Sequence, residues 1–394
     1  MKTCSRRLLA LSLALLMLIF SASAMADTVK LKVWGSQENQ ELLSELVEEF
    51  KAANPETEWD ISLGVVGEPE ARTRYLEDPA AAADVFAFAN DQLMELVNAD
   101  ALYEVTINLD KIIEENTAGS IESATLGEYL YGYPMTSDNG YFLYYDKSVL
   151  SEDDVKSLDA LLAAANAAGK KVFMDVSNGW YIASFFLGAG GTLGLTEDGK
   201  QTCDFNNELG VAAGEAIRAF CADPAFQTGD DSVLVGGMGG SICAGVSGTW
   251  NAAAISEKLG ENYAAAPLPT FTCGGEQKHM ASFIGTKILG VNTQTQFPLE
   301  AMALAEFLTS EAAQLKFFET RALGPTNINA AANPAVLENI ALAALSAQSE
   351  WGVSQKLVLG GYWSPAEAFG LEMESKSTGD MQAMLDTMVA QITQ

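Results

Sequence analysis

Short alternating segments and amphipathic segments follow one another along nearly the whole chain, and this order constrains the fold most. Residues 28–34 (TVKLKVW) alternate apolar and polar side chains, as a strand with one buried face does. From about Asn39 to Phe50, apolar residues recur at helical spacing, and residues 59–65 alternate again. Strand, helix and strand in this order predict an α/β fold with helices on the faces of a sheet.

The later segments repeat this pattern with few interruptions. Residues 84–88 (DVFAF) are typical of a buried strand, and an alanine-rich helix is expected to stop at Gly169. The loops are short, and we find neither a repeat nor a low-complexity linker, so two lobes that share crossings are expected. The further elements predicted are helices at 157–168, 208–220, 299–318 and 381–392, a helix from about Trp180, strands at 172–176 and 241–246, strands around Tyr133-Pro134 and 141–145, and a hairpin turn at Asp198-Gly199.

The first residues resemble a secretory leader. A positively charged start precedes the uncharged stretch 8–20, which is too short to span a bilayer comfortably, and Ala24-Met25-Ala26 offers a cleavage site. We therefore predict a signal peptide at 1–26 and an exported mature protein in the periplasm or outside the cell, with an uncleaved anchor as the alternative. Cys4 precedes the apolar run, so it does not form a lipobox.

The charge of the chain excludes one class of partner. Lys and Arg together number 22 against 52 Asp and Glu, and the formal net charge is −30. Such a charge repels phosphate backbones, so nucleic-acid binding is not expected. Like charge and a shuttling role both favour a monomer.

Four cysteines remain after the leader: Cys203, Cys221, Cys243 and Cys273. Export permits disulfides, and four cysteines allow three full pairings that the sequence does not separate. Buried free thiols are the alternative, and both stay open. No CxxC spacing is present, so a zinc cluster is not expected.

Motifs for catalysis are scarce. A Ser-His-Asp or Cys-His pair would need His279, the one histidine, and no G-x-S-x-G elbow accompanies it. We predict that His279 is an exposed loop residue. The glycine-rich run at 236–240 lacks the lysine and spacing of a phosphate loop, so we interpret it as a structural turn. No cofactor or metal is indicated.

Four tryptophans lie at predicted strand ends or beside glycines: Trp34, Trp180, Trp250 and Trp363. Flat aromatic faces stack on the apolar faces of pyranose rings, while carboxylates and amides bind the hydroxyls. A single tryptophan is more often part of a core. Four at such junctions, which face the cleft in open α/β sheets, favour sugar binding.

Several stretches in the same order carry a resemblance to a known family. The chain resembles the extracellular solute-binding proteins of ABC importers, in the branch typified by maltose- and maltodextrin-binding proteins, over nearly the whole mature chain. The stretches are LKVWGS at 31–36, DVFAFANDQ at 84–92, GYPMTSDNGYFLYYDK at 132–147, GVSGTW at 245–250, APLPTF at 266–271 and LAEFLTSEAAQLKFFETRALGPTN at 304–327.

The resemblance implies two α/β lobes joined by hinge crossings, with the ligand held in the cleft between them. It places one lobe at 27–136 and 289–334, and the other at 137–288 and 335–394. Hinge bending would close the cleft, and a membrane permease would receive the ligand.

The same resemblance implies a set of ligand-binding residues. Asp91 matches the acid of an Asp-Arg pair in which Gln92 stands for the arginine, Asp138 matches an acid after the Tyr-Pro crossover, and Glu38 stands near an early Asp-Lys pair. Ser177-Asn178 replaces a further acid. Compared with the family, the aromatic residues that would stack on the sugar are kept, whereas the polar residues that would bind its hydroxyls differ. The candidates are Trp34, Glu38, Phe88, Asp91, Gln92, Asp138, Trp180, Trp250, Tyr362 and Trp363.

The sequence therefore predicts a binding protein and not an enzyme, with an oligosaccharide such as maltose or maltotriose as ligand. Another sugar is one alternative. A cation such as a polyamine is a second, and it predicts a cleft where carboxylates outnumber stacking partners and affinity falls with salt. A secreted glycoside-active enzyme using Asp91 and Asp138 is a third.

Overall fold

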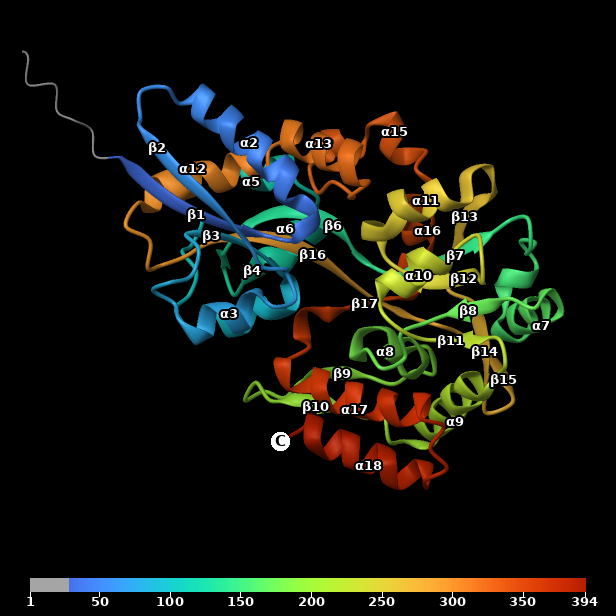
Figure 1. The fold of residues 1–394 in the computed structure, drawn as a ribbon. Coiled ribbons are helices and arrows are strands. Elements are labelled where there is room, and N and C mark those ends of the chain that lie inside the picture. Colours follow the sequence, from blue (N-terminus) through green and yellow to red (C-terminus); the bar gives the residue numbers. More distant parts are fainter. Residues whose placement is uncertain (1–27) are drawn as a thin grey trace, which may run out of the picture.

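The structure is a computed structural model that describes residues 28–394, and the predicted leader at 1–26 lies outside the described residues. The described residues form two α/β lobes, each with its own main sheet and its own large apolar core (Figure 1). The start of the described chain lies in the first lobe and the C-terminal helices lie in the second. The predicted α/β class is confirmed.

The sheet of the first lobe consists of β1 (Val29–Gly35), β2 (Trp59–Val65), β3 (Val85–Ala89), β6 (Tyr133–Gly140), β16 (Ser282–Val291) and β17 (Gly352–Ser354). β1 lies between β2 and β3 and runs parallel to both, so the carboxyl ends of these strands meet at one edge. β16 extends the sheet antiparallel to β3 and also pairs with β6 and β17. The strands predicted at 28–34, 59–65 and 84–88 are confirmed.

Helices and one small hairpin surround this sheet. Leu43, Leu46 and Phe50 of α2 are buried in the first core, because the helical repeat turns them all toward the sheet. The elements are η1 (Gln37–Asn39), α2 (Gln40–Ala53), α3 (Ala71–Glu77), η2 (Asn90–Gln92), α4 (Leu93–Asn98), α5 (Leu109–Glu115), α6 (Ala118–Ala124), β4 (Thr125–Leu126), β5 (Tyr129–Leu130), α12 (Pro298–Leu308), α13 (Glu311–Arg321), α14 (Ile328–Ala331) and α15 (Pro334–Leu337).

The single helix predicted at 299–318 is wrong, because α12 and α13 are separate helices. The Thr309 hydroxyl donates to the carbonyl of Ala305, 2.9 Å away, at the end of α12. The Ser310 side chain then accepts from the backbone N–H of Ala313 and caps α13. A serine at this position starts a new helix, whereas the apolar repeat alone continues across the break.

The sheet of the second lobe has the order β11-β8-β12-β7-β13, with β7 antiparallel to both of its neighbours. The strand predicted at 172–176 ends earlier than expected, at Phe173. Two hairpins flank the sheet, and the turn predicted at Asp198-Gly199 is confirmed by the positive φ of Gly199. The strands are β7 (Phe142–Asp146), β8 (Lys171–Phe173), β9 (Leu193–Leu195), β10 (Gln201–Cys203), β11 (Phe226–Gln227), β12 (Ile242–Ser247), β13 (Tyr263–Ala266), β14 (Thr270–Cys273) and β15 (Glu276–His279).

The helices of the second lobe include the end of the chain. Phe369 of α17 and Leu385 of α18 are buried in the same core as Phe185 of α8. The left-handed stop predicted at Gly169 is confirmed. The helices are η3 (Asp154–Lys156), α7 (Leu158–Ala168), α8 (Gly179–Gly188), α9 (Glu208–Ala222), α10 (Asp231–Gly237), η4 (Thr249–Asn251), α11 (Ala252–Leu259), η5 (Gly260–Asn262), α16 (Ile340–Gln348), η6 (Ser349–Trp351), η7 (Gln355–Leu357), η8 (Gly360–Tyr362), α17 (Trp363–Glu374) and α18 (Met381–Ile392).

The chain passes between the lobes along extended segments. β6 of the first sheet is followed almost at once by β7 of the second, and β16 follows the β14–β15 hairpin of the second lobe into the first sheet. β17 returns to pair with β16 before α17 begins. These strands are shared crossings, and the lobe limits at 136, 288 and 334 stay a prediction.

His279 does not lie in an exposed loop as predicted. It ends β15, it is half-buried, and its ring stacks on Trp351 with 3.4 Å between the ring centroids. Burial beside this indole lowers the pKa of His279. The glycine-rich run 236–240 has the structural role that was predicted: it ends α10, and Gly239 has a positive φ.

Candidate functional site

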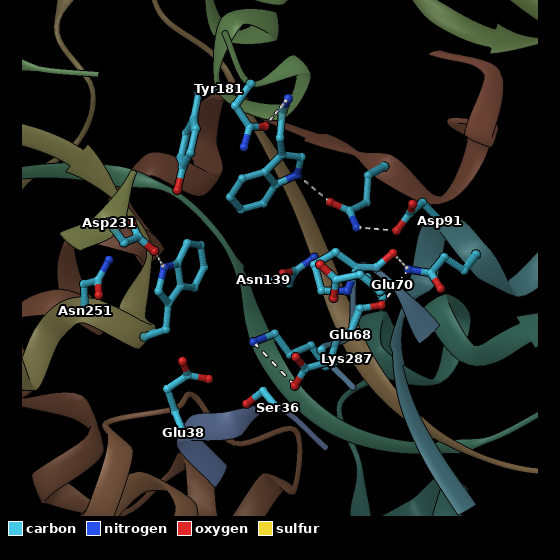
Figure 2. Close-up of a pocket in the computed structure, with 18 of the residues that line it drawn as sticks. Ser36, Glu38, Glu68, Glu70, Asp91, Asn139, Tyr181, Asp231, Asn251 and Lys287 are labelled. Atoms are coloured by element: carbon cyan, nitrogen blue, oxygen red, sulfur yellow. Dashed lines mark hydrogen bonds and ion pairs between the residues drawn. The ribbon is translucent and has the colours of Figure 1, made fainter. Parts of the chain in front are cut away.

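A cavity of about 800 Å³ lies between the lobes, and both lobes contribute to its walls (Figure 2). The first lobe contributes the segments that follow β1, β2 and β3, at the carboxyl edge of its sheet. The second lobe contributes the starts of α8 and α17 and the turn η4. A crevice at the carboxyl ends of parallel strands is the usual ligand site of open α/β sheets.

The second lobe provides an aromatic wall, formed by Trp180, Tyr181, Trp250 and Trp363. The ring centroids of Trp180 and Trp250 are 5.7 Å apart, and their planes are tilted by 41°. The three indoles are half-buried, so part of each ring is accessible. Tilted rings of this kind present flat apolar faces to a ligand that curves past them.

Local backbone chemistry places these indoles. Trp180 stands in the first turn of α8, where the Asn178 side chain caps the helix by accepting from the Trp180 N–H, 3.0 Å away. Trp250 follows Gly248, and a Cβ on this glycine would lie 1.9 Å from the Trp250 ring. Only glycine therefore lets the indole fold back over the chain at the end of β12.

The first lobe provides an acidic wall, formed by Glu38, Glu68, Glu70 and Asp91. Glu38 lies in η1 after β1, the next two lie in the loop after β2, and Asp91 lies in η2 after β3. Their side chains line the same cavity because the three strands are parallel and end at one edge. Asp231 and Glu367 of the second lobe also line the cavity. Two cationic side chains line it as well, those of Lys287 and Arg321.

Asp91 connects the two walls through Gln355. Asp91 is 6% exposed and accepts a hydrogen bond from Gln355 Nε2 at 2.8 Å. Gln355 Oε1 in turn accepts from Trp180 Nε1 at 2.9 Å, as the dashed lines of Figure 2 show. Burial raises the pKa of Asp91 to about 7, although the charge of Arg72 nearby favours the ionised form.

Lys287 lies on β16 between the two walls. Its Nζ is 4.0 Å from Glu68 Oε1 and 5.6 Å from the centroid of the Trp250 ring, over which it lies. Gln92 also lines the cavity, but its amide is occupied by the backbone: Nε2 donates to the Glu68 carbonyl, 2.7 Å away, and Oε1 accepts from the N–H of Arg72 at 2.9 Å.

Residues 45–344 match the family of bacterial extracellular solute-binding proteins. The chain belongs to this family. It is 28% identical to the galactooligosaccharide-binding protein of Bacillus subtilis (strain 168), over 93% of this chain and 89% of that protein.

Solved structures are similar over the whole described chain. One, with acarbose, has a TM-score of 0.85 and 31% identity, covering 93% of this chain and 99% of the other. A maltodextrin-binding protein from L. casei BL23 without ligand has a TM-score of 0.77 and 25% identity, covering 93% of this chain and 99% of that one. The two-lobed fold of solute-binding proteins, expected from the sequence, is confirmed.

In this solute-binding protein, part of the predicted set lines the cavity: Glu38, Asp91, Gln92, Trp180, Trp250 and Trp363. Trp34, Phe88 and Tyr362 do not. Phe88 and Tyr362 are fully buried in the two cores, where the Tyr362 hydroxyl donates to the Gly179 carbonyl, 2.9 Å away.

The misplaced aromatics have a common physical reason. Neighbouring side chains of a strand point to opposite faces, so the residue at the cavity edge of β3 is Ala89, whereas Phe88 points into the core. Trp34 packs beside Phe86, with ring centroids 6.1 Å apart, and covers Gly64. The position of a residue at the end of a strand therefore does not determine whether its ring points into the cavity or into the core.

Asp138 lies outside the cavity as well. Its Oδ2 accepts from Thr249 Oγ1 at 2.6 Å and from the Gly324 N–H at 2.9 Å, which joins η4 to the segment after α13. It lies on β6, one of the strands that cross between the lobes. The pairing of Asp91 with Asp138 that an enzyme would need is not formed in the cavity.

Several residues that line the cavity were not predicted from the sequence: Glu68, Glu70, Asn139, Tyr181, Asp231, Asn251, Lys287, Arg321 and Gln355. One of them has a sequence signal. Lys287 is the only charged residue of β16 (SFIGTKILGV), and a charge inside an apolar strand needs a partner or a ligand. Gln355 has no such signal.

The remaining predictions concern the thiols and metals. The four cysteines of residues 28–394 are free thiols, so the bridged alternative is wrong; burial raises the pKa of Cys203 and Cys221 to about 12. Within that range, no three His, Cys, Asp or Glu side chains group as a metal site requires. No described helix is long and apolar enough to span a membrane.

Proposed function

We propose that this protein captures an oligosaccharide between its lobes and delivers it to the membrane permease of an ABC importer. The observation that carries the proposal is the pair of Trp180 and Trp250, 5.7 Å apart across from a wall of carboxylates. Indole faces stack on the apolar faces of pyranose rings, and carboxylates accept hydrogen bonds from the hydroxyls.

We propose further that the ligand is an α-glucan fragment such as maltose or maltotriose. The cavity volume lies in the upper part of the range for ligand sites, so it has room for more than one ring. Relatives named for maltodextrin and galactooligosaccharide binding, and a relative solved with acarbose, support an oligosaccharide ligand. They leave other sugars as the first alternative.

The protein would act by binding and not by turnover. A sugar that contacts both walls has a higher affinity for the closed arrangement than for an open one, so it shifts the population toward closure. The closed form would then be recognised by the permease. The protein would be exported, as other members of an extracellular family are, and would act as a monomer.

One observation favours a second candidate, a cationic solute such as a polyamine. Carboxylates outnumber aromatic rings on the cavity walls. The carboxylates are Glu38, Glu68, Glu70, Asp91, Asp231 and Glu367, and the rings are those of Trp180, Tyr181, Trp250 and Trp363. The negative charge of the chain would also attract a cation. The burial of Asp91, which raises its pKa to about 7, weakens this attraction at neutral pH.

Tryptophan fluorescence of the protein without its leader tests both candidates, titrated with maltose, maltotriose, longer maltodextrins, galactooligosaccharides and spermidine. A saturable change with the α-1,4 glucans alone is expected, with affinity rising with chain length as more rings find contacts. A response to another sugar alone would keep the transport role and reject the glucan. A response to spermidine alone would reject sugar binding.

A further inference from the structure

Glu68 and Lys287 are two buried charges that fall short of a full ion pair. Glu68 is 5% exposed, and the side chain of Lys287 is 13% exposed. Their charged atoms are 4.0 Å apart, which is beyond hydrogen-bond distance. Among the described residues, Glu68 Oε1 has no hydrogen-bond partner at all. Buried charges are normally satisfied by hydrogen bonds, so this pair is incomplete.

The backbones that carry the incomplete pair are held in place. The loop that carries Glu68 is held by Gln92, whose Nε2 donates to the carbonyls of Glu68 and Pro69 at 2.7 and 3.2 Å. Lys287 is fixed in the middle of β16, opposite Ala89 on one side and Thr136 on the other. Both backbones are therefore anchored, so the two charged groups stay next to each other at the cavity wall.

Both side chains line the cavity beside an aromatic face. Lys287 Nζ lies over the Trp250 ring at 5.6 Å from its centroid, and Figure 2 shows the ammonium extending toward the cavity with the Glu68 carboxylate next to it. A pyranose ring that stacks on Trp250 would bring its edge hydroxyls to this pair. A hydroxyl can accept from an ammonium and donate to a carboxylate, so two neighbouring hydroxyls can satisfy both charges.

We propose that Glu68 and Lys287 form a subsite for a pair of vicinal hydroxyls on the sugar ring that stacks on Trp250. This inference rests on the proposed function and names the polar contact that fixes the ring's orientation. Charge-assisted hydrogen bonds are stronger than neutral ones, so the subsite selects rings with two adjacent free hydroxyls at that edge. Gln92 acts on it as a positioning residue, through the loop that carries Glu68.

The test is calorimetric titration of maltotriose into the parent and into Lys287→Met, Glu68→Gln and the double variant. Each single variant is expected to bind roughly 10- to 100-fold more weakly, because it removes a hydrogen bond to a charged group. The fold-loss of affinity in the double variant should be smaller than the product of the two single fold-losses, because both side chains hold the same hydroxyl pair. Lys316→Met, which removes a lysine paired with Glu45 and Glu49 on the surface of the first lobe, is the matched control and should bind as the parent does.

The outcomes separate the subsite from the proposed function. Maltotriose binding by Lys287→Met and Glu68→Gln at parental affinity would overturn the subsite and leave the function standing. A fall in thermal stability without a fall in affinity would likewise show a purely structural pair. If the parent binds no member of the sugar panel, the function and the subsite both fall.

Discussion

The two walls of the cavity are built from different chemistry on similar scaffolds. The acidic wall stands where parallel strands end, and its members Glu38 and Glu70 are exposed while Asp91 is buried. The aromatic wall stands where helices begin, with Trp180 and Trp363 at the starts of α8 and α17. One wall offers hydrogen-bond acceptors and the other offers flat apolar area.

This difference divides the work of binding between the lobes. Apolar area contributes affinity with little directionality, whereas hydrogen bonds to charged groups depend strongly on geometry. A ligand that is to close the cleft must satisfy both walls at once. The hydrogen-bonded chain from Asp91 through Gln355 to Trp180 joins the two walls.

The largest expected effect concerns Asp91 and stability. Burial raises its pKa from an ordinary 3.8 to about 7, so between these values the folded protein holds a proton that the unfolded chain releases. The stability that this proton contributes at low pH is lost as pH rises from about 4 to 7, roughly 4 kcal/mol in all. Asp91→Asn should remove this dependence.

Urea unfolding of the parent and Asp91→Asn at pH 4.5 and pH 8 checks this linkage. The free energy of unfolding of the variant minus that of the parent should be higher at pH 8 than at pH 4.5, by up to roughly 3 to 4 kcal/mol. The Asn oxygen can still accept from Gln355, so the hydrogen bond is kept. An equal difference at both pH values would mean that Asp91 titrates normally.

The next-largest expected effect measures how much the aromatic wall contributes to the free energy of binding. Trp250→Ala should weaken maltotriose binding by about 1–3 kcal/mol, by analogy with aromatic stacking on other rings. Titration calorimetry measures it. Trp351→Ala is the matched control, since that indole is also half-buried but stacks on His279 away from the cavity. If Trp250→Ala binds maltotriose with the affinity of the parent, Trp250 does not stack on the sugar.

A smaller effect is expected from the link between the walls. Trp180→Phe keeps an aromatic face but removes the Nε1–H that donates to Gln355, and should cost about 1 kcal/mol of binding. Gln355→Leu should cost a similar amount and be nearly non-additive with Trp180→Phe, because both remove one hydrogen bond. A double-mutant cycle by calorimetry measures the coupling, and full additivity would show that the link does not serve the ligand.

The smallest expected effect is that of salt. A neutral sugar should bind with less than about a twofold change between low and high NaCl, because neither wall contacts a charge on the ligand. Spermidine, if it binds, should lose affinity steeply over the same range. Fluorescence titration at several salt concentrations checks this. A steep salt dependence for every ligand that binds would shift the balance toward the acidic wall and a cationic solute.

The sequence by itself determined the fold class, most element positions and the three tryptophans of the aromatic wall. These follow from local rules: side-chain periodicity predicted β1, α2 and α18, and its position at the end of a predicted strand placed Trp250 at the cleft. The break between α12 and α13 was missed because a serine cap interrupts a repeat that otherwise looks continuous.

Only the tertiary structure decided which polar groups meet. Gln355 is 264 residues from Asp91 in the chain, and Lys287 comes from a strand that crosses over from the second lobe to face Glu68. Distances of this kind depend on how sheets pair and how lobes pack, and no local pattern encodes them. The same packing buried Phe88 and Tyr362, because which side of an element faces the cleft is fixed by its neighbours and not by its own sequence.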